Sequence, residues 1–140
     1  MAGIHYFSKE LHFKLQHPRK TSNWINSVVE QENASIKSLD YIFCKDPFLI
    51  EINRRFLKQD AYTDIIAFDY SSKPKEIEGE IYISIDRVRE NAPKFKTSFD
   101  TELHRVMIHG VLHLVGYKDK RITEISIMRK KEEAYLSLRN

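Results

Sequence analysis

The chain has 140 residues, of which 41% are hydrophobic and 31% charged, with a formal net charge of +3 and one cysteine. This length fits one domain, and the composition is that of a folded soluble protein, which excludes a disordered chain. No apolar run approaches the length of a membrane span, no signal peptide opens the chain, and Cys44 has no partner for an internal disulfide. We therefore expect a cytoplasmic protein, whose weak positive charge permits an anionic partner such as nucleic acid without requiring one.

The first part of the chain predicts an extended segment, a helix, a strand and a second helix. Residues 4–15 alternate enough to favour extended structure, and residues 18–33 carry apolar side chains at helical spacing. Residues 38–45, SLDYIFCK, are rich in aromatic and β-branched side chains and predict a strand. Asp46 as N-cap and Pro47 at the first helical position predict a helix that continues through FLIEINRRFLK.

Two strands and a helix follow. Residues 62–70, YTDIIAFDY, and residues 79–85, GEIYISI, both have strand character, with the loop SSKPKEIE between them. Asp86 is expected to open a helix that Pro93 interrupts or shortens, because proline lacks the amide hydrogen that a helix interior needs.

The last part of the chain predicts two helices. Asp100 is expected to cap a helix over residues 101–115, and a final helix is expected over residues 123–138. The buried face of the final helix is predicted to carry Ile125, Met128 and Leu136, and its RKKEE run is predicted to be solvated. The expected fold is α/β (α+β): a single domain with about four strands in one mixed sheet and about five helices.

The stretch HGVLHLVGYKD, residues 109–119, predicts a metal site. Positions four apart in a helix share one face, so the imidazoles of His109 and His113 can reach a single ion. Asp119 would lie about 15 Å further along a continuous helix, and it can be a third ligand only if the chain reverses. Gly116 is suited to that reversal, because glycine adopts the left-handed conformation that ends helices.

This spacing matches the H-x-x-x-H-x-x-G-x-x-H pattern of metzincin metalloproteases, with two changes. Gly110 replaces the glutamate that acts as general base, and Asp119 replaces the third histidine. A pair of histidines at this spacing is often only packing, whereas three donors with glycine at the turn are much rarer. His104 points about 140° away from His109 and is expected to be a packing or surface residue.

Three motifs together resemble the YbeY family, the bacterial metal-dependent endoribonucleases of ribosomal RNA maturation. HGVLHLVGYKD resembles the family signature H-G-x-L-H-L-x-G-Y-D-H. INRRFLKQDAYTDIIAFDY resembles its L-N-x-x-Y-R-x-x-D-x-P-T-D-V-L-S-F segment, and GEIYIS resembles its G-D-I-x-I strand. The motifs occur in the family's order, and the resemblance covers nearly the whole chain beyond the first twenty residues.

The resemblance implies one compact α/β metalloendoribonuclease domain over residues 1–140. It implies a divalent ion, expected to be Zn²⁺, held by His109, His113 and Asp119, and hydrolysis of single-stranded RNA. The implied substrate is small-subunit ribosomal RNA near its 3′ end, with a part in ribosome quality control and no DNA or membrane partner. The native metal, the cleavage site and the oligomeric state stay open.

Three positions depart from the family pattern. Asp119 stands where most members have histidine, and Lys118 where they usually have aspartate. The family arginine that serves the RNA or its phosphate falls on Leu57, a residue that can do neither job. Arg54 or Lys58 would supply the missing charge, or both are solvated helix residues.

Without a glutamate at position 110, the proton acceptor is also open. The metal alone could activate water, the RNA's own 2′-hydroxyl could attack, or an acid among Glu102, Asp64 and Glu80 could help. Two other functions compete with RNA cleavage. A metalloprotease shares the ligand spacing but needs the missing glutamate, whereas a non-catalytic ribosome-assembly factor with a structural metal accommodates both Gly110 and Leu57.

Overall fold

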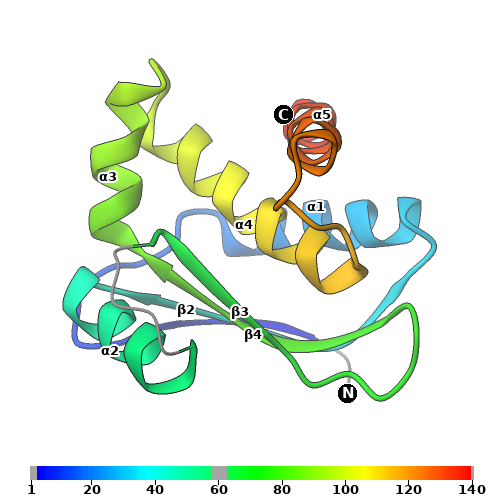
Figure 1. Ribbon diagram of the computed structural model, residues 1–140, viewed down its shortest axis with the longest axis horizontal. Helices are drawn as coiled ribbons and strands as arrows, with labels where there is room; N and C mark the ends of the chain where they lie inside the picture. The colour runs from blue at the N-terminus through cyan, green and yellow to red at the C-terminus, as the bar shows by residue number, and fades with distance from the viewer. Residues whose placement is uncertain (1–2, 58–62, 140) are drawn as a thin grey trace.

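Four strands form one mixed sheet in the order β1-β2-β4-β3 (Figure 1). A computed structural model describes residues 3–57 and 63–139. The strands are β1 (Ile4–Ser8), β2 (Ser35–Cys44), β3 (Ile65–Asp69) and β4 (Glu76–Ser84). β1, β2 and β4 are parallel, and the edge strand β3 runs antiparallel to β4. The mixed four-stranded sheet expected from the sequence is confirmed.

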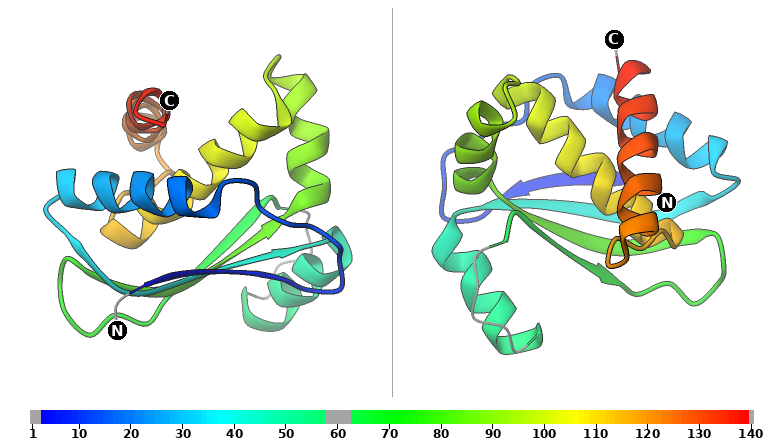
Figure 2. Two further views of the ribbon diagram at one scale, coloured as in Figure 1. Left: turned by 180° about the vertical axis from the view of Figure 1, so that it is seen from behind. Right: turned by 45° about the horizontal axis from the view of Figure 1, so that its top comes forward.

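Five helices surround this sheet, as predicted. They are α1 (Pro18–Gln31), α2 (Asp46–Leu57), α3 (Ile85–Lys94), α4 (Phe99–Val115) and α5 (Ile122–Ser137). Helices α1 and α4 cover one face, α5 crosses outside them, and α2 lies on the opposite face (Figures 1 and 2). None of the helices in the described ranges is long and apolar enough to cross a membrane.

The main core lies between the sheet and the layer formed by α1 and α4. Ile81 and Ile83 of β4 are fully buried there, and each such side chain contributes about 1.5–3 kcal/mol through removal from water. Tyr41 of β2 donates a hydrogen bond of 2.9 Å to the carbonyl of Met107 in α4. Trp24 of α1 donates one of 2.8 Å to the carbonyl of Tyr135 in α5. These bonds fix α4 and α5 relative to the sheet and to α1.

Helix α4 lies unusually close to the sheet at Gly110. A Cβ atom at this position would stand 2.8 Å from Cδ1 of Ile81 and 2.9 Å from Cδ1 of Ile65. Distances below about 3 Å are not tolerated between carbon atoms in a packed core. Position 110 therefore faces the sheet, and any larger residue there would require the side chains of Ile81 and Ile65 to move.

Two helix starts differ from the sequence predictions. Helix α4 begins two residues earlier than expected, with Ser98 and not Asp100 as its N-cap, because the Ser98 hydroxyl accepts a hydrogen bond from the Thr101 amide at 3.1 Å. Ser84 likewise caps α3, which places Asp86 inside the first turn. The prediction that Ile125 of α5 is buried is wrong, because 38% of its surface is exposed.

Candidate metal centre

The last two turns of α4 and the loop after them bring together the three side chains that the sequence singles out. The carboxylate Oδ2 of Asp119 lies 3.2 Å from Nε2 of His109 and 3.3 Å from Nε2 of His113. The two imidazole rings are 4.7 Å apart, centroid to centroid. One donor atom from each residue lies within 4.8 Å of the others, so the group could hold a metal ion.

The chain reverses at Gly116, as predicted. This residue ends α4 with φ of 127°, a backbone conformation that side chains with a Cβ rarely adopt. Its amide donates to the carbonyls of Leu112 and His113, and the amide of Tyr117 donates to Leu112 at 3.0 Å. These bonds satisfy carbonyls at the end of the helix and turn the loop back toward the two histidines.

The donor set fits a small divalent ion in chemistry and in spacing. Two ligands at about 2.1 Å from one ion stand about 3.4 Å apart at a tetrahedral angle. The observed distances of 3.2 and 3.3 Å between the Asp119 oxygen and the two imidazole nitrogens are close to that value. Two imidazoles and one carboxylate, with room for a further ligand, form the open donor set of catalytic zinc sites.

Glu132 of α5 supports His109 from behind. Its carboxylate accepts from Nδ1 of His109 at 2.5 Å, and only 3% of the residue is exposed. Burial by itself lowers the pKa of His109, but the hydrogen bond and charge of Glu132, with Asp119 and Asp64, outweigh it and raise that pKa. A proton held at Nδ1 leaves Nε2 free to face Asp119, which is how carboxylates orient metal-binding histidines.

This role of Glu132 was not predicted from the sequence. The RKKEE run of α5 was predicted to be solvated, and that prediction is wrong for Glu132 because the residue is buried against α4. The available signal was its position four residues after Met128 and three before Tyr135, on the buried side of the helix. Helical spacing alone does not show that this side meets the metal-site helix.

Arg105 connects Glu132 to two further acids. Its guanidinium binds both oxygens of Glu102, at 2.9 and 2.6 Å, and Glu132 at 3.0 Å, and it lies 3.9 Å from Asp64. The hydrogen bond that Arg105 donates to Glu102 is the main cause that raises the pKa of Arg105, with burial opposing it. A single partly buried cation therefore links three carboxylates beside His109.

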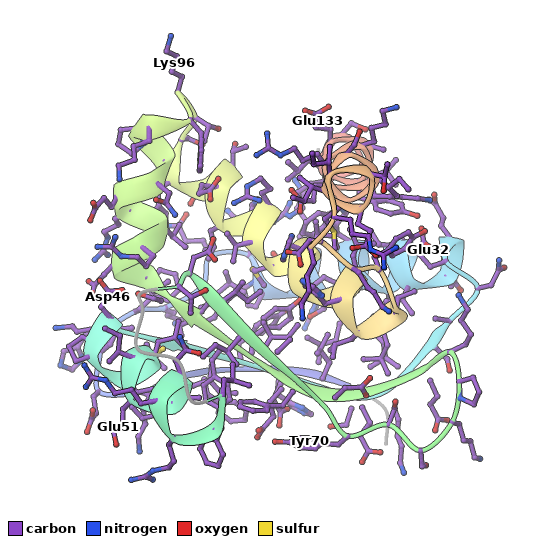
Figure 3. All side chains as sticks on the ribbon, in the orientation of Figure 1. Glu32, Asp46, Glu51, Tyr70, Lys96 and Glu133 are labelled. Atoms are coloured by element: carbon purple, nitrogen blue, oxygen red, sulfur yellow. The ribbon has the colours of Figure 1, made fainter. Side chains whose placement is uncertain are left out.

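A second network holds the loop that delivers Asp119. Glu32, just after α1, is 8% exposed and accepts from the hydroxyls of Tyr117 at 2.7 Å and of Tyr135. Lys131 of α5 donates to the same carboxylate at 3.1 Å. Figure 3 shows Glu32 at the end of α1 beside that loop. Because Tyr117 is two residues before Asp119, this network fixes the loop to α1 and α5.

An open pocket of about 420 Å³ lies in front of the three donors. It is lined by residues of α2, β3 and α4 and by Asp119. Of the three acids considered as proton acceptors, Asp64 lines the pocket, and burial raises its pKa against the lowering effect of Arg105 and His109. Glu102 is bound to Arg105, and Glu80 accepts from Tyr70, on the α2 side of the sheet (Figure 3).

Of the two residues proposed to replace the family arginine, Arg54 and Lys58, the described residues include only Arg54. Leu57 lines the pocket and is 46% exposed, so the arginine position does face the site. Arg54 is exposed and is not among the residues that line the pocket, and Lys58 lies outside the described residues. Lys118 and Lys120 are exposed on the loop that carries Asp119.

Comparisons with known proteins give one consistent family. The family described as "Endoribonuclease YbeY" matches residues 5–140. Proteins named Endoribonuclease YbeY from Amoebophilus asiaticus and Flavobacterium psychrophilum are 48% and 51% identical to this chain. The matches cover 96% and 94% of this chain and 92% and 94% of those relatives. The solution structure of a Thermotoga maritima protein, 26% identical, has a TM-score of 0.68 and covers 98% of this chain and 89% of that one.

Proposed function

Because this chain belongs to the YbeY endoribonuclease family, we propose that it is a metal-dependent endoribonuclease that hydrolyses phosphodiester bonds of single-stranded RNA. The observation that carries the proposal is the convergence of His109, His113 and Asp119 at an open pocket. This geometry agrees with the function that the names of the relatives give.

The residues around the pocket have different roles in the proposed reaction. His109, His113 and Asp119 would hold the ion, and Glu132 keeps a proton on Nδ1 of His109 so that Nε2 stays available. When bound, a divalent ion supplies positive charge that makes a nearby water more acidic and neutralises the scissile phosphate. Asp64 lines the same pocket, and because burial raises its pKa, its carboxylate is a better proton acceptor than an exposed aspartate.

We further propose the finer assignments that the family resemblance suggests. The ion is Zn²⁺, since two imidazoles and one carboxylate suit zinc. The substrate is small-subunit ribosomal RNA, processed near its 3′ end in the cytoplasm as part of ribosome maturation and quality control. The exposed Lys118 and Lys120 beside the site would attract RNA phosphates.

The experiment compares cleavage of a single-stranded RNA and a duplex RNA with and without a chelator. We expect the single strand to be cut, the duplex to be spared, and the chelator to stop cleavage until zinc is restored. His113→Ala should abolish cleavage while the protein still melts cooperatively, and the exposed His12→Ala serves as the matched control. Undiminished cleavage by His113→Ala, or full activity in chelator, contradicts the proposal.

One alternative function has an observation in its favour. Leu57 lines the pocket where the family arginine is expected, and a non-catalytic ribosome-assembly factor with a structural metal would need no such arginine. In that case the purified protein would bind the small subunit and retain its metal but would cleave no RNA. A metalloprotease is disfavoured, because Gly110 faces the sheet and leaves no place for a glutamate base.

A further inference from the structure

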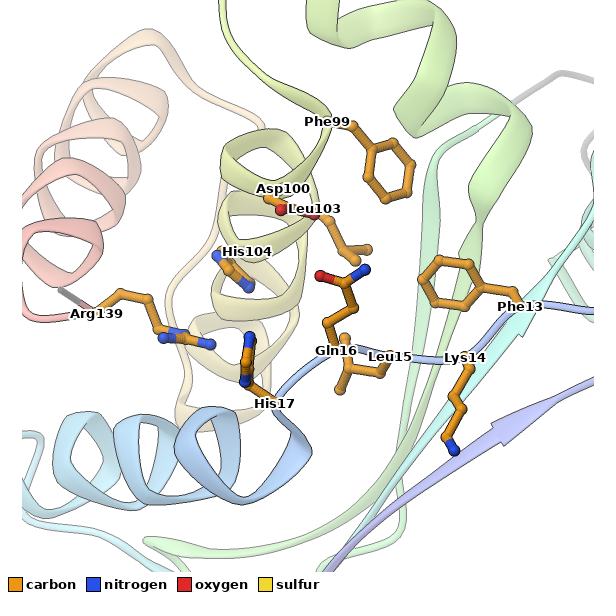
Figure 4. Close-up of a pocket in the computed structure, with 10 residues that line it drawn as sticks. All are labelled: Phe13, Lys14, Leu15, Gln16, His17, Phe99, Asp100, Leu103, His104 and Arg139. Atoms are coloured by element: carbon orange, nitrogen blue, oxygen red, sulfur yellow. The ribbon is translucent and has the colours of Figure 1, made fainter.

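A second pocket lies on the other side of α4 from the metal centre. It has a volume of about 150 Å³ and is formed by the segment before α1, the first half of α4 and Arg139, two residues after the end of α5 (Figure 4). Its polar lining residues are Lys14, Gln16, His17, Asp100, His104 and Arg139. A cavity of similar size holds a molecule as large as benzene, so this pocket has room for one small anion but not for a nucleoside.

Arg139 carries a buried positive charge for which the described residues provide no counter-ion. Only 9% of the residue is exposed, and its Nη2 donates to the hydroxyl of Thr21 at 3.0 Å. The guanidinium lies 5.9 Å from the ring of Trp24, and its buried Nε has no hydrogen-bond partner among the described residues. Arginine cannot lose its proton, so a buried guanidinium without a carboxylate is costly unless an anion joins it.

The start of α1 lies beside this pocket, because its N-cap residue His17 is part of the lining. His17 has φ of 52° and makes no side-chain cap, and the first turn contains no acidic residue. The positive end of the dipole of this 14-residue helix is therefore not offset by an acid in its own first turn. Figure 4 shows the Arg139 guanidinium extending toward the imidazoles of His17 and His104.

His104 completes a site that is rich in donors and poor in negative charge. Burial lowers its pKa to about 4, with the nearby charges of Arg139 and Lys20 adding to the effect and Asp100 opposing it. At neutral pH the ring is uncharged and has one N–H to donate. Asp100 is the only acid among the residues that line this pocket, and the cationic side chains of Lys14 and Arg139 outnumber it.

We propose that this pocket binds a phosphate group, held by the Arg139 guanidinium and the imidazoles of His17 and His104, beside the positive end of α1. A guanidinium beside a helix N-terminus is a combination suited to phosphate oxygens. The phosphate would be inorganic phosphate or the terminal phosphate of a nucleic acid, since the pocket is too small for more. The proposal is independent of RNA cleavage and of the metal centre.

Trp24 provides a specific probe, because it is the only tryptophan in the chain and contacts both Arg139 and His104. Inorganic phosphate is titrated at constant ionic strength while Trp24 fluorescence is recorded. We expect a saturable change in wild type, and Arg139→Gln should weaken the apparent affinity about tenfold or more. Arg129→Gln, an exposed position on α5, is the matched control and should bind as wild type does. Histidine NMR should show the pKa of His104 rising with phosphate.

Two further titrations identify the source of the phosphate. A 2′-O-methyl trinucleotide with a 5′-phosphate is compared with the same trinucleotide without it. Saturation by inorganic phosphate assigns the pocket to the free ion, and saturation only by the phosphorylated trinucleotide assigns it to nucleic-acid ends. No saturation by either in wild type overturns the proposal, as does equal binding by an Arg139→Gln variant that melts like wild type. If that variant does not fold, His104→Gln replaces it and should also bind phosphate more weakly.

Discussion

Two of the three histidines on helix α4, His104 and His109, lie five residues apart in surroundings of opposite charge. His109 faces three carboxylates, those of Glu132, Asp119 and Asp64, which raise its pKa despite burial. His104 faces Arg139 and Lys20, and burial together with these cations lowers its pKa to about 4. One side of α4 therefore carries the negative charge that binds a metal cation, and the other side carries the positive charge that attracts an anion.

The difference comes from the neighbouring elements and not from α4 itself. Helix α5 supplies Glu132 to one side, and Arg139, two residues after the end of α5, lies on the other. The C-terminal part of the chain therefore contributes a charged residue to each side of α4. Four substitutions test this contrast, beginning with the one expected to have the largest effect.

Asp119→Ala should remove most of the metal affinity. The loss of one of three donors is expected to weaken binding by on the order of 100-fold or more, because even residues behind the ligands are worth 10–100-fold. Elemental analysis and zinc titration of the purified protein measure the effect. Asp40→Ala, on β2, is the control. If Asp119→Ala retains stoichiometric metal, the third donor is misassigned.

Glu132→Gln should weaken metal binding by about 10–100-fold and also lower the pKa of His109. Without this carboxylate only Asp119 and Asp64 oppose the effect of burial, so the pKa of His109 in the metal-free protein should fall from its raised value. NMR of the imidazole resonances and a zinc titration report the two effects separately. The adjacent Glu133→Gln, at an exposed position, should change neither. A His109 pKa that stays raised in Glu132→Gln would mean that other groups control it.

Tyr117→Phe should loosen the loop that carries Asp119. Loss of the 2.7 Å hydrogen bond to buried Glu32 is expected to cost about 1 kcal/mol of unfolding free energy. Metal affinity should fall several-fold, because the loop is then less well fixed. Urea unfolding and zinc titration measure these effects, and Tyr70→Phe, on the other face of the sheet, is the control. Unchanged metal affinity would show that Gly116 positions Asp119 without help from Glu32.

His104→Gln should change how stability depends on pH. The folded-state pKa of about 4 lies below the ordinary value of 6.5, so the unfolded chain binds more protons between these values. Stability is therefore fully present above pH 6.5 and is lost as the pH falls toward 4. The variant should show a shallower loss over this window in thermal melts, and His12→Gln should not. If the melting temperature depends on pH in the same way in wild type and variant, then the pKa of His104 is not lowered and its contrast with His109 is wrong.

Much of the fold was predictable from residue patterns. The helix and strand segments follow from apolar spacing, and the turn at Gly116 follows from the distance between His113 and Asp119. The start of α4 was misplaced because Ser98 and Asp100 are both good capping residues, and only the backbone geometry distinguishes them.

The supporting residues of the site were not predictable in the same way. Glu132 meets His109 across 23 residues of sequence, and Glu32 meets Tyr117 across 85. Such contacts depend on how α5 crosses α4 and on where α1 ends, and no local pattern encodes either. A charged side chain in a helical run gives the same pattern in sequence whether its face meets water or another helix.

The close packing of α4 against the sheet at Gly110 distinguishes this protein from the peptidases that share its histidine spacing. At Gly110 a single added methyl would already lie within 3 Å of Ile81 and Ile65, so a glutamate there would require both of those side chains to repack. The packing of the sheet, as well as the missing base, therefore separates the two chemistries. A glutamate at position 110 would be accommodated most readily together with smaller side chains at positions 65 and 81.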